Sequence, residues 1–122
     1  MKVLNANVID TINIFPNKKE ILGYKCIYNE QAIFRDGNII DTKIELKKHS
    51  PLGLSWGYNG SGPAQAVLAV LCAFTKDDEF SLKYYMDFKN DVICQLPRKD
   101  CVLKYSEIQH WVNLKRIKNQ LL

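Results

Sequence analysis

The chain has 122 residues, of which 47% are apolar and 25% are charged, with a formal net charge of +4. These values are typical of a globular domain and exclude a disordered chain, a collagen-like repeat and a disulfide scaffold. The longest apolar run, residues 66–74, is too short to span a membrane. The first residues show no signal-peptide pattern, so we expect a cytoplasmic protein with no membrane partner.

We expect one domain over residues 1–122, because this length supplies a single hydrophobic core. Residues 1–23 contain short apolar pieces and a turn, and they predict an N-terminal arm or an edge strand. Residues 24–58 predict a β-meander of about three strands that ends in a glycine-rich junction. Asp36-Gly37 favours a two-residue hairpin turn, and residues 38–46 predict the third strand.

Residues 63–122 predict a helical part with three helices. The first is apolar from Ala64 to Phe74 except for Gln65, which is typical of a central, buried helix. Pro63 suits its first position, and Ser61 or Gly62 its N-cap.

The second helix is predicted over residues 79–95, with Asp77 or Asp78 as its cap and Pro97 after its end. Residues 106–109 form a capping box that predicts the start of a third helix. The apolar positions that we expect this third helix to bury are Ile108, Trp111, Val112 and Leu114. The predicted fold is therefore α+β, with a small antiparallel sheet followed by three helices.

The glycine-rich junction lacks every complete catalytic motif that it resembles. Pro63 and Ala64 stand where a phosphate-binding loop needs Lys and Ser or Thr, and Ser61 lacks the flanks of a hydrolase nucleophile. A weaker anion site on the backbone amides of residues 60–62 stays open. The alternative is a structural junction between sheet and helix, which would be built from His49, Trp56, Tyr58, Gly60, Ser61, Gly62 and Pro63.

The four cysteines form no C-x-x-C pair, and we expect them to be reduced. Cys94, Cys101 and His110, with Cys72 or His49, fit no structural zinc spacing. We therefore predict no metal site, no cofactor and no catalytic residue.

The last 25 residues carry the whole positive excess, with six basic and two acidic residues. Such a segment suits nucleic acid or an acidic protein surface. A solvated helix face that complements the helix dipole remains the alternative. The candidate binding residues are Arg98, Lys99, Lys104, Lys115, Arg116 and Lys118.

Residues 49–65 read HSPLGLSWGYNGSGPAQ and are followed by the apolar helix. This segment resembles the core of an uncharacterised family of small bacterial, plasmid and phage proteins, with Leu54 in place of the usual Phe. The resemblance extends over roughly residues 24–97 and supplies no catalytic residue.

The resemblance implies a mobile-element context, in which small proteins often bind a host component, including defence systems such as CRISPR effectors. We therefore expect a non-enzymatic protein that binds a host protein or nucleoprotein. One alternative is a nucleic-acid-binding accessory protein that uses the basic C-terminal helix. Another is an enzyme or small-ligand binder that uses the glycine-rich loop and His49.

Overall fold

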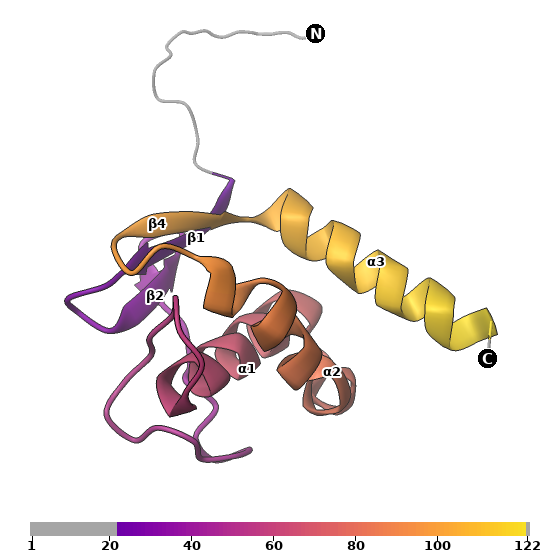
Figure 1. Ribbon diagram of the computed structural model, residues 1–122, viewed down its shortest axis with the longest axis horizontal. Coiled ribbons are helices and arrows are strands. Elements are labelled where there is room, and N and C mark those ends of the chain that lie inside the picture. The colour runs from indigo at the N-terminus through magenta and orange to yellow at the C-terminus, as the bar shows by residue number, and fades with distance from the viewer. Residues whose placement is uncertain (1–21, 122) are drawn as a thin grey trace, which may run out of the picture.

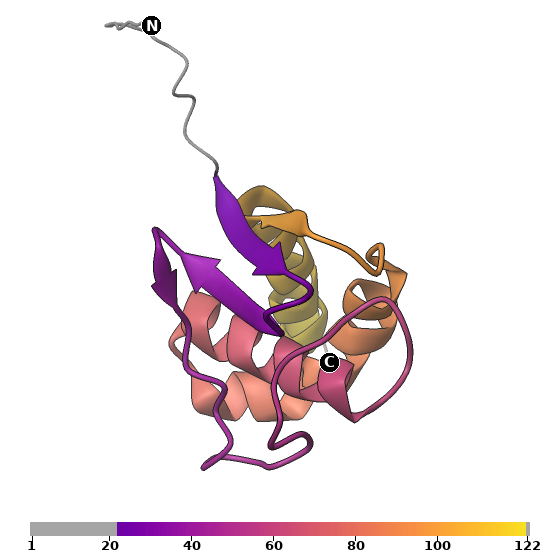
Figure 2. The same cartoon turned by 90° about the vertical axis from the view of Figure 1, so that its left-hand side faces the viewer.

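The computed structural model describes residues 22–121. The fold is α+β, with three α-helices and a sheet of four antiparallel strands in the order β3-β2-β1-β4. The elements in chain order are β1 (Gly23–Ile27), β2 (Ala32–Arg35), β3 (Asn38–Ile39), α1 (Ser61–Thr75), α2 (Asp78–Asp91), the 3-10 helix η1 (Ile93–Gln95), β4 (Cys101–Lys104) and α3 (Tyr105–Leu121). Figures 1 and 2 show the helices on one side of the sheet. The predicted fold class is confirmed. An arm or edge strand was predicted for residues 1–23, and residues 1–21 of that segment lie outside the described part of the chain.

The turn between β2 and β3 has the predicted geometry. Asp36 and Gly37 have φ values of +53° and +81°, and the residues that flank them are Cα partners across the turn. Positive φ at both central positions defines the tight turn that matches strand twist.

The third strand is much shorter than predicted, because β3 ends at Ile39 and not near residue 46. The chain turns at Lys43, which has a φ of +62° and donates its backbone N–H to Asp41 Oδ1 at 2.9 Å. A local bond of this kind offers the backbone an alternative to strand pairing.

The fourth strand, β4, was not predicted. It lies between α2 and α3 and pairs antiparallel with β1, from Gly23↔Lys104 to Cys26↔Cys101. Four residues are too few to show a clear alternation, and their partner strand lies far away in the sequence. Because β4 runs directly into α3, that helix begins at Tyr105 and not at a cap on Ser106.

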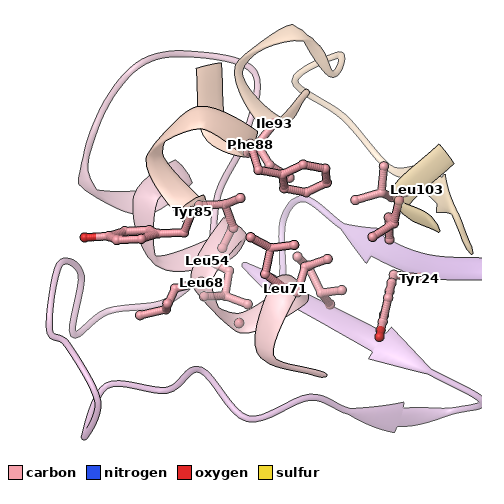
Figure 3. Packing of buried hydrophobic residues seen from close by; sticks show 14 of the residues in the cluster. Tyr24, Leu54, Leu68, Leu71, Tyr85, Phe88, Ile93 and Leu103 are labelled. Carbon is pink, nitrogen blue, oxygen red and sulfur yellow. The ribbon is translucent and has the colours of Figure 1, made fainter. Parts of the chain in front are cut away.

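The core lies between the sheet and α1, which is buried continuously from Gly62 to Cys72. Figure 3 shows Leu71 of α1 in one cluster with the sheet residue Tyr24 and the α2 residue Phe88. The prediction of a buried first helix is confirmed. In α3, Ile108 and Val112 join this core, but Leu114 is 53% exposed, so its predicted burial is wrong.

The second helix is capped as the sequence predicted. Asp77 precedes α2, and its Oδ1 accepts the backbone N–H of Phe80 at 3.0 Å. The α-helix ends at Asp91, and the short helix η1 completes the segment that was predicted as helical up to residue 95.

We expect Asp77→Ala to lower the free energy of unfolding by about 1 kcal/mol, because one N-terminal amide of α2 loses its acceptor. Asp77→Asn keeps an acceptor oxygen and is the matched control. Urea denaturation monitored by circular dichroism measures both. Equal stability of the two variants would contradict the capping role.

Candidate functional site

The glycine-rich junction is held to α1 by the side chain of Gln65, which is completely buried. Its Oε1 accepts the backbone N–H groups of His49 at 2.7 Å and Ser50 at 3.1 Å. Its Nε2 donates to the carbonyl oxygens of Thr42 at 2.6 Å and Lys47 at 3.2 Å. These four bonds use the full capacity of the amide. The segment before the junction is thereby fixed to the start of α1.

The imidazole of His49 contacts α2. Its Nε2 lies 2.7 Å from the hydroxyl of Tyr85, and Figure 3 shows that hydroxyl pointing away from the apolar cluster. Burial, and then the positive charges of Lys47 and Lys89, lower the pKa of His49. The folded protein therefore favours the neutral ring.

A buried lysine, which the sequence analysis missed, lies at the same junction. Lys89 is only 6% exposed, and its Nζ donates to Asn59 Oδ1 at 2.7 Å. It occupies the last turn of α2, where the carbonyl end of the helix dipole favours a cation. No carboxylate among the described residues lies within ion-pair distance of it. The hydrogen bond from Lys89 to Asn59 therefore ties the glycine-rich junction to α2.

Trp56 connects the junction to the segment that follows α2. It is fully buried, and its Nε1 donates to the carbonyl of Lys99 at 3.0 Å. The next residue, Gly57, has a φ of +85° and donates its N–H to the carbonyl of Ile93 at 3.0 Å. A Cβ at Gly57 would lie 2.5 Å from Cγ of Arg98. This position therefore needs glycine for its backbone conformation and for its close contacts.

The start of α1 differs from the prediction at Ser61 and Pro63. The N-cap is Gly60, which makes no side-chain capping bond, and Ser61 is the exposed first helical residue. Capping by Ser61 is therefore wrong, and Pro63 is the third helical residue and not the first. The missing N–H of a proline is tolerated there too, because the first four amides have no partner within the helix.

Tyr58 and Gly62 complete the junction through close packing. A Cβ at Gly62 would lie 2.9 Å from both Ser55 Cβ and the Tyr58 hydroxyl. The guanidinium of Arg98 lies 4.9 Å from the centre of the Tyr58 ring. One of the six candidate basic residues is therefore part of this junction.

Two of the remaining basic residues form ion pairs, and the other three are exposed. Lys115 lies 3.1 Å from Asp87, and Arg116 lies 3.9 Å from Asp77, so both cations pack α3 against α2. The side chains of Lys99, Lys104 and Lys118 are exposed in three different elements or loops. The sequence could not show the two ion pairs, because their carboxylates lie on another helix.

A row of three apolar residues and one lysine crosses the side of the sheet that the helices leave uncovered. Lys25 is the Cα partner of both Phe34 and Val102, and Phe34 is the partner of Ile39. Direct partners in an antiparallel sheet point to the same side. Ile39 is 64% and Val102 38% exposed.

Lys104, which is paired with Gly23, has the same orientation as Val102. We call this surface the outer sheet face and define it by Lys25, Phe34, Ile39, Val102 and Lys104. The sequence analysis missed it because the row includes β4, whose pairing was not predicted.

No cluster of three or more potential metal ligands occurs within residues 22–121. Over the same range, no helix has the length and hydrophobicity that crossing a membrane requires.

We expect Gln65→Leu to destabilise the protein by roughly 2–5 kcal/mol, because it leaves four backbone groups without their partner. Ser61→Ala is the control and should change stability by less than about 0.5 kcal/mol, since Ser61 is exposed and caps nothing. Chemical denaturation of both variants checks this. A large loss of stability for Ser61→Ala and no loss for Gln65→Leu would contradict the role given to Gln65.

We expect the stability of the protein to fall as the pH is lowered, because His49 is held neutral in the folded state. An unfolded histidine has a pKa of about 6.5, and folding lowers the pKa of His49. This contribution is therefore fully present above about pH 6.5 and is lost as the unfolded state binds protons at lower pH. Thermal midpoints measured from pH 7.5 to 5 should fall less steeply for His49→Gln than for the parent. Identical slopes for His49→Gln and the parent would reject the role of His49.

Comparison with known proteins places the chain in a family but gives no characterised relative. No curated protein matches the chain, and no solved structure matches it. A family of unknown function, DUF6166, matches residues 21–114, a range that includes the whole sheet, α1, α2 and most of α3. The match ends before Lys115, so three of the candidate basic residues lie outside it. The chain therefore belongs to the family of unknown function DUF6166.

Proposed function

We propose that the protein is a non-catalytic binding module that engages a host protein through its outer sheet face. The observation that carries the proposal is the cross-strand row of Ile39, Phe34, Lys25 and Val102 on a sheet whose other side is covered by helices. Ile39 and Val102 are exposed in this row, and Phe34 is half-buried. Exposed apolar side chains with polar residues around them are a feature of protein interaction sites. The mobile-element resemblance of the HSP…PAQ segment supports a host component as the partner.

The charges on this face indicate the chemistry of the partner. Its charged residues are Lys25 and Lys104, and neither has an ion-pair partner among the described residues. A complementary surface would place aliphatic or aromatic side chains against the row and acidic groups beside the two lysines.

A nucleic acid is a poorer match for the same face. Sequence-tolerant binding of single strands relies on several aromatic side chains for base stacking, and this row has one, Phe34. On α3, Lys115 contacts the carboxylate of Asp87 in α2, and Arg116 contacts that of Asp77, the N-cap of α2. Phosphate contacts there would compete with these ion pairs.

The test compares Ile39→Glu and Val102→Glu with Leu52→Glu. Leu52 is also an exposed apolar residue, but it lies in the loop between β3 and α1 and not on a strand. Each protein is immobilised and exposed to a nuclease-treated bacterial host lysate. Proteins retained by the parent are then purified and titrated by calorimetry. We expect the two sheet variants to weaken the direct interaction at least about tenfold and Leu52→Glu to leave it unchanged.

Two results would overturn the proposal. One is a purified partner that binds the sheet variants as tightly as it binds the parent. The other is retention that occurs only from lysate without nuclease treatment and that falls steeply with salt, as phosphate contacts require. Circular dichroism and thermal melting establish that each variant is folded before binding is compared.

A further inference from the structure

Two cysteines are direct partners on neighbouring strands. Cys26 on β1 and Cys101 on β4 form the last pair of that antiparallel ladder. Direct partners have Cα atoms about 4.5–5.5 Å apart and side chains on the same side of the sheet. A disulfide requires Cα atoms about 4.4–6.8 Å apart. The backbone therefore already has a spacing that a disulfide can bridge.

The two sulfur atoms differ in exposure. Cys26 is 1% exposed, whereas Cys101 lies on an edge strand and is partly exposed. A hollow of about 220 Å³ is lined by both cysteines and by Lys25, Ile27, Asp100 and Val102. A small reagent can therefore reach the partly exposed Cys101 more easily than the buried Cys26.

Both thiols are weakly acidic in the folded protein. Burial, and then the neighbouring Cys101, raise the pKa of Cys26 to about 12. Burial also raises the pKa of Cys101, and the charge of Asp100 adds to this effect. Because the thiolate is the nucleophile, reaction of the pair should be slow at neutral pH and faster at higher pH.

We propose that Cys26 and Cys101 form a reversible disulfide by exchange with a low-molecular-weight disulfide such as oxidised glutathione. The Cys101 thiolate attacks one sulfur of the reagent, forms a mixed disulfide and releases one glutathione thiolate. The Cys26 thiolate then attacks Cys101 Sγ and releases the second. The two protein thiols lose two electrons and two protons, and the reagent is reduced to two thiols.

The bond would join the central strand β1 to the edge strand β4 and close the chain between residues 26 and 101. Crosslinking a long loop restricts the unfolded chain and stabilises the fold. Cys72 and Cys94 lie in α1 and η1, and neither is a strand partner of another cysteine. The proposal does not depend on the protein-binding function.

The test treats the purified, reduced full chain with an excess of oxidised glutathione. Intact mass spectrometry should show a monomer lighter by about 2 Da, since two hydrogen atoms are lost. Peptide mapping without reduction should join the peptides that contain Cys26 and Cys101. The thermal midpoint should rise and return after reduction. The rate should increase about tenfold per pH unit between pH 7 and 8.

Variants separate the two steps. Cys101→Ser should abolish the crosslink, and Cys26→Ser should stop at a glutathione adduct on Cys101. Cys94→Ser is the matched control and should crosslink like the parent. Mapping the parent protein keeps the test decisive if a substitution at the buried Cys26 prevents folding. A crosslink between other cysteines, a covalent dimer, a final adduct without ring closure, or no mass change would each overturn the proposal.

Discussion

The fold of this chain depends on one buried amide. Gln65 is the only strongly polar side chain within the apolar stretch of α1, and each of its four hydrogen-bonding positions is used by the backbone of residues 42–50. These backbone groups belong to an irregular segment and have no strand partner, so burial without the amide would leave them unpaired. An apolar residue at position 65 would suit the helix and disrupt the loop. The polar side chain is therefore required by the segment that packs against α1.

The glycine-rich junction is a framework that joins distant parts of the chain. Gln65 ties it to the segment before it, Trp56 ties it to the segment after α2, and Lys89 ties its tip to α2 itself. Each bond joins residues far apart in the sequence, so the junction can form only when sheet and helices are assembled. This arrangement accounts for an unusual composition without requiring a reaction at the loop.

The sequence predicted features whose signals are local. The Asp36-Gly37 turn, the Asp77 cap and the burial of α1 each follow from a few adjacent residues. Strand β4 and the pairing of Lys115 with Asp87 depend on partners in distant segments, and local sequence patterns carry no information about which distant segments meet. Ser61 failed as a cap because the chain enters α1 through Gly60 in an extended conformation. Of the candidate site, the sequence identified Lys104 but not the apolar row beside it, which exists only when four strands are in register.

The direct passage from β4 into α3 makes these two elements one mechanical unit. No loop separates Lys104 from Tyr105, and the N–H of Tyr105 donates to the carbonyl of Leu22 at 3.0 Å. At its other end, α3 is held to α2 by the ion pair of Lys115 with Asp87. The edge strand therefore cannot separate from the sheet without straining the helix contacts. Amide protons of β4 and of the first turns of α3 should exchange with solvent together, as one cooperative opening unit and not by independent fraying.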